Sequence, residues 1–479
     1  MVSKKFLITT AQASYHENCD GDIVPYGHVP GRKVFPKAKP HKHLLEGFEK
    51  YCEVTGAELI ILPTQGQNAL EDILHEDLRD RPEVFTGQVL KLNKNVQIRD
   101  LIVPPQNVDP ATGKASMVSK YNSSIIFPHT KQRFFPVPVF NSDLPRYLYT
   151  TGAVTMPNYN THNHKGDTAE RNHVFGGLVV EVVDNTFFNI RPIKALKNGK
   201  FVDLGLLYDG NKKPVKIGVD SMIVGDYHNA NKDETAVQAT YDMIKQFKPS
   251  RIFLHDFFDG ESVNHHESDN QLKRARLYRE GRLNLRNELS DCYKEIVKLS
   301  KMVPGEVNVV SSNHDAFLPR YINEGVWFKH DLWNSDIGAY LYQMGIQLEL
   351  PEDEIDDASY LLEAGMSKFG DIPDNVNFLR LKDSYRRHGF QLASHGHKGA
   401  NGARGGKAKA REITGGGKSI SGHSHVMEMY GDTYIVGTNS RLGQSYTAGS
   451  GNASIAANAI LYSNGIVQLI PIIHGRWKV

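Results

Sequence analysis

Ser221-Met222-Ile223-Val224-Gly225-Asp226-Tyr227-His228 is the stretch around which the chain is organised. Its apolar first half predicts a buried strand, which ends at a glycine followed by a carboxylate and an imidazole two residues apart. In open α/β sheets, the residues just beyond such strand ends carry the chemistry. A single Asp-x-His pair arises often by chance, so its meaning depends on the strand ends that follow it.

Four later apolar runs also end in residue types that bind metals. They cover 252–260, 307–315, 390–397 and 419–425, and they deliver Asp256, Asn313-His314-Asp315, His395 and His423-Ser424-His425. Each run has the composition of a buried strand, so we expect the five polar ends to meet at one edge of a sheet. The mixture of oxygen and nitrogen ligands suits Mn, Fe or Zn better than Ca or Mg alone.

The order and spacing of these motifs resemble the calcineurin-like metallophosphoesterase superfamily over about residues 215–475. The series is Asp-x-His, Asp, Asn-His-Asp, His-Gly and Gly-His-x-His. Two positions depart from the family pattern: His255 and Ser312 stand where the family has a turn glycine. These departures put the loop geometry in doubt more than the ligands. The resemblance implies an α/β fold, a four-layer α-β-β-α sandwich, and a two-metal phosphoesterase.

The resemblance also implies a role for each motif residue. The first metal would be bound by Asp226, His228, Asp256 and His425, and the second by Asp256 as a bridge with Asn313, His395 and His423. His314 would protonate the leaving oxygen, and Asp315 would orient His314. The expected cofactors are two divalent ions, Mn first, with Fe, Zn or Mg as alternatives. Such a pair clamps a phosphate and shares a hydroxide that attacks in line.

Several neighbouring residues admit a second interpretation. His397 is an alternative to His395 as the ligand after the fourth run. Asp259 is expected to orient its loop rather than to bind metal. The pair His265 and His266 either contacts substrate or lies on the surface.

An internal duplication is indicated by the order of the predicted elements. A strand at 5–10, a helix at 43–54 and a strand at 57–62 recur as a strand at 215–224, a helix at 235–247 and a strand at 252–254. Thr10 and Gln12 fall where Asp226 and His228 fall, so the first copy lacks these ligands. We expect a degenerate metallophosphoesterase-like domain at 1–208 and a catalytic domain at 209–479, with a helical insertion at about 326–375. Chance resemblance between two α/β units is the alternative.

The net charge, the number of cysteines and the length of the apolar runs limit the partners and the compartment that we expect for this chain. The formal net charge is +2, so attraction to a polyanion has to come from local patches. Three widely spaced cysteines indicate a reducing compartment rather than a disulfide framework. Neither a signal segment nor an apolar run of about 18 residues occurs, which favours a cytoplasmic protein that does not span a membrane.

Two basic segments favour DNA as the substrate. A long polar helix is predicted over 260–302 and carries Arg276 and Arg279, although a solvated helix face explains the same pattern. The glycine-rich segment 398–418, expected to lack regular structure, carries Lys398 and Arg404 and would let cations approach a phosphate. Its His-Gly-His-Lys-Gly text also resembles phage metallophosphoesterases, among them the pre-early nucleases that degrade host DNA. A phage origin would place the protein in the host cytoplasm.

The sequence therefore predicts a metal-dependent DNA nuclease. A small-molecule phosphodiesterase or phosphatase of the same superfamily is one alternative, and a non-catalytic assembly protein with a vestigial site is another. The degenerate first domain would serve packing or the contacts of a homo-oligomer.

Overall fold

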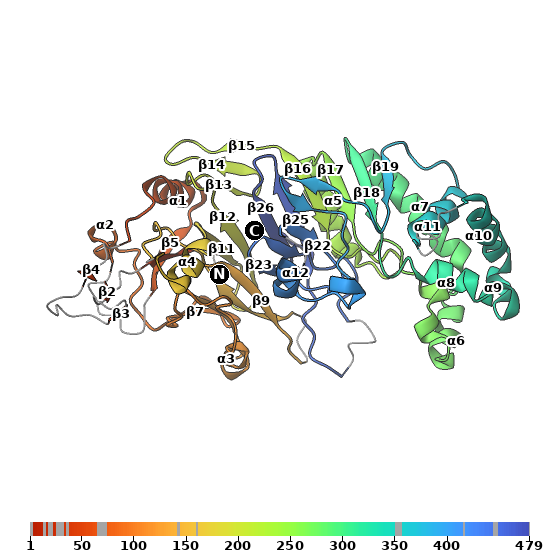
Figure 1. The fold of residues 1–479 in the computed structure, drawn as a ribbon, viewed down its shortest axis with the longest axis horizontal. Coiled ribbons are helices and arrows are strands. Elements are labelled where there is room, and N and C mark those ends of the chain that lie inside the picture. The colour runs from red at the N-terminus through yellow and green to blue at the C-terminus, as the bar shows by residue number, and fades with distance from the viewer. Residues whose placement is uncertain are drawn as a thin grey trace.

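The computed structural model describes the chain except for residues 1–2, 13–15, 18–22, 25–32, 35–37, 65–73, 141–143, 160, 350–356, 415–416, 444–448 and 479. The fold is mixed α/β, as the sequence predicts. The first half of the chain lies at one end of an elongated molecule, and a group of helices from the second half lies at the other (Figure 1). Within the described residues, no helix combines the length and the apolar character needed to cross a membrane.

Three large sheets form two layers. The four-stranded sheet has the order β12 (Phe188–Lys194), β11 (Gly176–Val182), β1 (Lys4–Gln12), β5 (Glu58–Thr64). The six-stranded sheet has the order β19 (Val376–Leu379), β18 (Glu306–Val310), β17 (Arg251–Leu254), β16 (Val219–Val224), β25 (Ala456–Tyr462), β26 (Val467–Ile472). These two sheets lie edge to edge at β12 and β26, and together they face the third sheet.

The third sheet is shared between the two halves of the chain. It has ten strands, in the order β20 (Arg386–Arg387), β21 (Phe390–Gln391), β22 (Ser419–Ser421), β24 (Thr433–Ile435), β23 (Glu428–Tyr430), β9 (Arg133–Val137), β10 (Arg146–Thr150), β8 (Ser124–Phe127), β7 (Val96–Arg99), β6 (Val89–Lys91). Two small sheets complete the set: β13 (Phe201–Asp203), β14 (Leu206–Tyr208) and β15 (Val215–Lys216), and β2 (His16–Glu17), β3 (Ile23–Val24) and β4 (Lys33–Val34).

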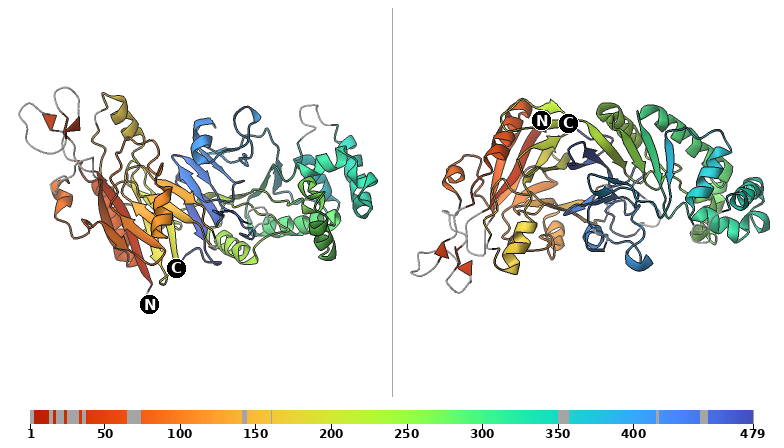
Figure 2. Two further views of the ribbon diagram at one scale, coloured as in Figure 1. Left: turned by 90° about the horizontal axis from the view of Figure 1, so that it is seen from below. Right: turned by 45° about the horizontal axis from the view of Figure 1, so that its top comes forward.

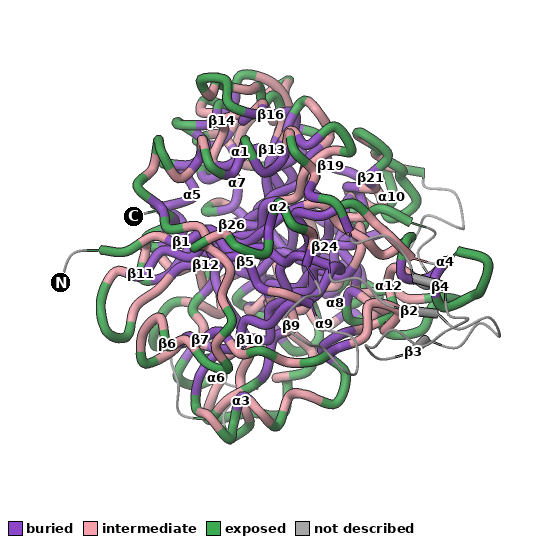
Figure 3. The backbone as a smooth tube through the Cα atoms, turned by 90° about the vertical axis from the view of Figure 1, so that its left-hand side faces the viewer, coloured by how far each residue is buried: buried purple, intermediate pink, exposed green. Residues whose placement is uncertain are grey.

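The core has a central part between the two layers and outer parts beneath helices. Ile8, Phe134 and Ile223 belong to the central part, which draws on both halves of the chain. Phe48 of α1 and Met243 of α5 pack on the outer face of the first layer. Strands buried on both faces read as continuous apolar runs, which explains why the sequence revealed them. Figure 3 shows these buried strands inside a rim of exposed turns.

The helices are α1 (Lys42–Thr55), α2 (Glu76–Arg79), α3 (Ala115–Tyr121), α4 (His164–Arg171), α5 (Glu234–Phe247), α6 (Gln271–Arg279), α7 (Leu285–Met302), α8 (Phe317–Asn323), α9 (Val326–Lys329), α10 (Ser335–Gln347), α11 (Ser359–Ser367) and α12 (Ala408–Thr414). Figures 1 and 2 place α6 and α8 to α11 together at one end, and we call this group the helical lobe.

The strand order of the first half recurs in the second half. β1 pairs in parallel with β5 and antiparallel with β11, and β16 pairs in the same way with β17 and β25. In the ten-stranded sheet, the order β6-β7-β8-β10-β9 is followed by its mirror order, β23-β24-β22-β21-β20. The two halves therefore share one topology and meet at equivalent strands.

A proline on each side interrupts the seam between β12 and β26. Pro192 and Pro471 have no N–H group, so these edge strands cannot form a regular ladder. Side-chain amides bridge the gap instead: Asn189 donates to the carbonyl oxygen of Pro471 (3.4 Å), and Gln468 donates to that of Pro192 (3.3 Å). The two contacts are equivalent under exchange of the halves.

Two expectations about helices are wrong. The single helix predicted over 260–302 is divided into α6 and α7, because Gly281 adopts a left-handed φ of 71° and the side chain of Asn284 caps α7. The segment 398–418 contains α12, which packs Ala408 against Tyr430 and Ile435. Most of the acidic run at 352–357 lies outside the described residues.

A buried ion pair joins the halves across the ten-stranded sheet. Arg133 of β9 donates to the Glu428 carboxylate of β23 (2.7 Å) and to the Met429 carbonyl oxygen (2.9 Å), and both charged side chains are buried. Removing one partner of such a pair leaves a buried charge without compensation.

We therefore expect Arg133→Met to lower the free energy of unfolding by about 3–5 kcal/mol, measured in urea. The double variant Arg133→Met, Glu428→Gln should recover part of this loss, because the Glu428 charge is then no longer left alone, although Asp109 still loses its contact with Arg133 (3.3 Å). A loss well below about 1 kcal/mol in the single variant would show that the pair does not couple the halves.

Candidate metal centre

The candidate ligands come from two facing sheets. Asp226 and His228 follow β16 and Asp256 follows β17, which are neighbours in the six-stranded sheet. His395 follows β21 and His425 follows β22, which are neighbours in the ten-stranded sheet. The expectation that all ligands share one sheet edge is therefore wrong. The composition of a buried strand does not say which of two stacked sheets the strand joins.

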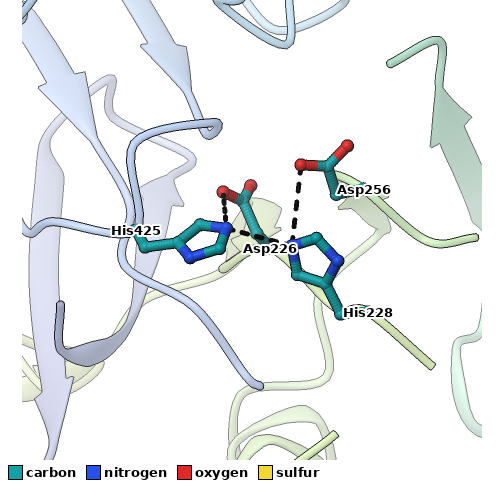
Figure 4. A group of neighbouring side chains, drawn as sticks. All are labelled: Asp226, His228, Asp256 and His425. Atoms are coloured by element: carbon teal, nitrogen blue, oxygen red, sulfur yellow. Dashed lines mark hydrogen bonds and ion pairs between the residues drawn. The ribbon is translucent and has the colours of Figure 1, made fainter. Parts of the chain in front are cut away.

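Four buried side chains form the first ligand group: Asp226, His228, Asp256 and His425. Nε2 of His228 lies 2.9 Å from Nε2 of His425 and 3.7 Å from Oδ2 of Asp256, and Nε2 of His425 lies 3.3 Å from Oδ2 of Asp226. Figure 4 shows the four side chains pointing toward one another. Two carboxylates and two imidazoles in this arrangement can hold one cation.

The second ligand group shares Asp256 with the first. It contains Asp256, His395 and His423, with Nε2 of His395 3.1 Å from Oδ2 of Asp256. His397 is absent from this group, although its ring lies 5.5 Å from that of His395. Asn313 follows β18, the strand beside β17, as its predicted role requires.

Unsatisfied buried oxygens indicate that the site is built for cations. Oδ1 of Asp226, Oδ1 of Asp256 and Oδ1 of Asn313 are buried, and none has a hydrogen-bond partner among the described residues. Buried polar atoms are nearly always paired, and a bound ion is one accepted reason for an exception. The donor set therefore fits divalent metal ions.

The backbone at the centre is strained. His228, Asp256, His423 and His425 adopt φ values of 46°, 43°, 81° and 56°. Non-glycine residues rarely take this left-handed conformation, which costs about 1–3 kcal/mol at each position and gathers at functional sites. The backbone hydrogen bond from His228 N–H to the Asp256 carbonyl oxygen (2.8 Å) holds two of these turns together.

Close packing accounts for the glycine of the Gly-His-x-His motif. A Cβ atom on Gly422 would lie 2.0 Å from Oδ1 of Asp226, so only glycine fits. The next N–H group, that of His423, donates to Oδ2 of Asp226 (2.7 Å). The motif thus positions the first carboxylate as well as supplying imidazoles.

The pKa values reflect burial and crowding of like charges. Burial and the neighbouring charge of Asp256 raise the pKa of Asp226. Burial alone would lower the pKa of His228, but the hydrogen bond and charge of Asp259 and the charges of Asp256 and Asp226 raise it to about 9. Burial and the charge of His228 lower the pKa of His425 to about 3. The carboxylates therefore gain from any cation that enters between them.

Asp259 holds two histidines in place. Its carboxylate lies 3.2 Å from Nδ1 of His228, and its backbone carbonyl oxygen lies 2.7 Å from Nδ1 of His314. Asp259 also forms a third group, with His228 and His314, whose ligand atoms lie close enough together to hold a metal ion. The expectation that Asp259 orients its loop rather than binding metal therefore stays a prediction. The Asp315 carboxylate, whose expected role is to orient His314, accepts a hydrogen bond from the Ser312 N–H group (2.9 Å).

Arg411, on α12, is a residue that the motif pattern did not reveal. Its guanidinium donates to the carbonyl oxygens of Gly406 (2.6 Å) and Gly422 (3.1 Å) and to the hydroxyl of Ser421. A Cβ atom on Gly396 would lie 2.3 Å from Nη1 of Arg411, so a side chain there would displace the guanidinium. Arg411 therefore ties together the loops that carry His395 and His423. A lone arginine in a glycine-rich segment gives no sequence signal for this role.

The structure separates the four predicted substrate-binding residues into two pairs. Lys398 and Arg404 face each other across a short bridge, and the Gly405 N–H group anchors this loop to the His397 carbonyl oxygen (2.7 Å). Arg276 and Arg279 lie on α6 in the helical lobe, where Arg276 pairs with Glu280 (2.7 Å). Only the first pair adjoins the metal centre.

His265 and His266 lie next to the centre through an aromatic neighbour. The ring of Phe317 lies 5.2 Å from that of His314 and 5.4 Å from that of His265. The two histidine rings are 3.8 Å apart. The side chain of Phe317 therefore contacts both His265 and His314.

The chain is similar to Protein A1 of Escherichia phage T5. The two are 25% identical over 460 residues, which cover 91% of this chain and 80% of Protein A1. No protein-family model matches the chain, and no solved structure matches it.

We expect Mn²⁺ to stabilise the protein against heat, by about 2.7 kcal/mol for each site when the free ion is at 100 times its dissociation constant. Asp226→Asn should raise the melting temperature in EDTA, because it removes a buried charge beside Asp256, and should reduce the rise caused by Mn²⁺.

The measurement is a thermal melt with EDTA or with MnCl₂, and the exposed Asp242→Asn is the matched control. A wild-type melting temperature that does not respond to Mn²⁺, Fe²⁺ or Zn²⁺ would contradict a metal centre.

Proposed function

We propose that the chain is a two-metal phosphoesterase that hydrolyses phosphodiester bonds in DNA. The observation that carries the proposal is the sharing of Asp256 by two buried ligand groups, with His314 beside them. A bridging carboxylate between two nitrogen-rich groups is the arrangement that two-metal hydrolysis needs. We further propose that the facing sheets are the four-layer sandwich of the calcineurin-like metallophosphoesterases, which the motif order supports.

When bound, two divalent ions would polarise the phosphoryl oxygens and make water a nucleophile at neutral pH. Asp226, His228 and His425 would hold one ion, His395, His423 and Asn313 the other, and Asp256 both. Mn²⁺ is our first candidate.

His314 is placed to move a proton. Its Nδ1 atom lies 2.7 Å from the backbone carbonyl oxygen of Asp259, so Nδ1 carries a hydrogen and donates it. The Nε2 atom is then the position that gains or releases the catalytic proton. The ring centroid of His314 lies 4.7 Å from that of His228, which places this proton beside the first ligand group.

Cations near the centre favour DNA over an uncharged or small substrate. The loop from Lys398 to Arg404 is anchored beside His397, and the charge of Arg404 reaches His423. Backbone phosphates of DNA next to the bond that is cut would meet these cations. Similarity to a phage protein is compatible with this substrate but does not specify it.

We propose that the first half is a degenerate copy of the catalytic domain. Neutral side chains stand at the positions of Asp226, His228 and Asp256, and each of them is hydrogen-bonded: Thr10 bonds Thr151 (2.6 Å), and Thr64 donates to Gln12 (3.0 Å). Lys131, at the position of His425, donates to Asn172 (3.0 Å). A cation would find no carboxylate pair there.

The proposed chemistry predicts different losses in two variants. His314→Ala should keep its metal and cut supercoiled plasmid about 10² to 10⁴ times more slowly, because the proton donor is removed. Asp256→Asn should lose both activity and metal, because it removes the shared charge. Plasmid cleavage in Mn²⁺ and the metal content of each protein are measured together.

The exposed His164→Ala is the control for these variants and should match the wild type. If His314→Ala also matches the wild type, the proton-donor assignment is wrong. Hydrolysis of nucleotide esters without cleavage of DNA would instead indicate a small-molecule phosphodiesterase.

The two basic pairs should differ in their effect on DNA binding. Replacing Lys398 and Arg404 by Gln should weaken binding and reduce the slope of log K against log salt by about 2, one for each lost phosphate contact. Replacing Arg276 and Arg279 by Gln should have a smaller effect, because Glu280 already neutralises Arg276. Binding is measured at several salt concentrations with Ca²⁺ in place of Mn²⁺, and equal effects of the two pairs would contradict this ranking.

A further inference from the structure

A cavity of about 480 Å³ opens between the two halves of the chain, and none of the candidate metal ligands is among its lining residues. β10 and the hairpin of β11 and β12 line it from the first half. Ile455 and the segment 471–476 line it from the second half. Its size lies in the range of small-molecule sites. The junction of two domain-like units is also a common place for such sites.

Arg146 is the first indication of a ligand. It is half-buried on the cavity wall, and its guanidinium makes no hydrogen bond or ion pair with any residue that the structure describes. Burial lowers its pKa, with no acidic group to offset the effect. The fully buried Arg133 and Arg191, by contrast, are both paired with carboxylates. Arg146 is thus a half-buried cation without a counter-ion among the described residues, and an anion in the cavity would supply one.

Asn189 adds an unused acceptor. It lines the cavity and is 1% exposed, and its side-chain N–H group donates to Pro471. Its Oδ1 atom has no hydrogen-bond partner among the described residues. A buried amide oxygen without a partner costs free energy, so this position favours a ligand that carries an N–H or O–H donor.

Aromatic rings supply flat walls. The rings of Tyr147 and Tyr149 stack at 5.1 Å with an angle of 13° between their planes. Phe187 and His474 lie 5.9 Å apart near the opening. Arg476 adds an exposed second cation there. Its acidic neighbour Asp184 accepts hydrogen bonds from the backbone of Thr186 and Phe187.

We propose that this cavity binds a nucleoside monophosphate. Arg146 would bind the phosphate, the aromatic walls would hold the base, and Oδ1 of Asn189 would accept a hydrogen bond from a base N–H group. A free phosphate would leave the aromatic walls and Asn189 unused. An uncharged nucleoside would leave Arg146 unpaired.

The cavity shares a wall with the metal centre, so the test has to separate the two. The Ile455 N–H group donates to the carbonyl oxygen of His425 (3.0 Å). Binding is therefore measured by calorimetry in EDTA, with dAMP as the probe and with deoxyadenosine and inorganic phosphate as the two part-ligands. The inference does not rest on the proposed nuclease activity, because no hydrolysis occurs under these conditions.

We expect one dAMP to bind per chain, at least 10-fold more tightly than either part-ligand. Arg146→Gln should weaken dAMP binding at least 10-fold, whereas the exposed Arg171→Gln should leave it unchanged. Asp226→Asn should also leave it unchanged, since Asp226 belongs to the metal centre. If Arg146→Gln does not fold, the exposed Arg476→Gln provides the second test and should weaken binding by several-fold.

Three results would overturn the proposal. They are the absence of dAMP binding at millimolar concentration, equal affinity for inorganic phosphate and dAMP, and affinity that survives both arginine substitutions. Loss of dAMP binding in Asp226→Asn would place the nucleotide at the metal centre instead.

Discussion

The second half of the chain depends on the burial of two carboxylates, Asp226 and Asp256, beside each other. Burial and the repulsion from Asp256 raise the pKa of Asp226. Burial alone would also raise the pKa of Asp256, but the charges of His395 and His314 hold it well below its usual value. The strained turns at His228 and Asp256 add to the cost. The fold holds these groups together by anchoring every loop of the centre to a strand. Divalent cations would turn the same repulsion into binding energy.

The candidate metal ligands could be proposed from the sequence because each lies shortly after an apolar run that predicts a buried strand. A run of this kind shows where a strand ends, and the residue types after it show what the end can bind. The sheet to which each strand belongs could not be predicted, since β16 and β22 are both buried strands that deliver ligands but join different layers. The residues that orient the ligands were equally hidden. Asp259 acts partly through its backbone oxygen, and Arg411 acts from a helix in a glycine-rich segment, so neither leaves a pattern in the sequence.

The two halves share one topology but differ in the charge of the side chains at equivalent strand ends. In the first half, β1 and β5 end at the neutral residues Gln12 and Thr64, which bond to each other. In the second half, the equivalent positions carry His228 and Asp256, which leave an oxygen unpaired. Neutral side chains that hydrogen-bond to each other stabilise the fold without a ligand. The buried charged set lowers the stability of the fold when no cation is bound.

The contacts at the seam between β12 and β26 are symmetric with respect to the two halves of the chain. Asn189 reaches the carbonyl oxygen of Pro471, and Gln468 reaches that of Pro192, so exchanging the two halves reproduces the contact. This reciprocity defines an isologous interface, which forms between identical subunits around a two-fold axis. A single chain has no need of such symmetry. The seam thus has the form of a homodimer contact inside one chain, and the two halves meet as two subunits of a dimer would.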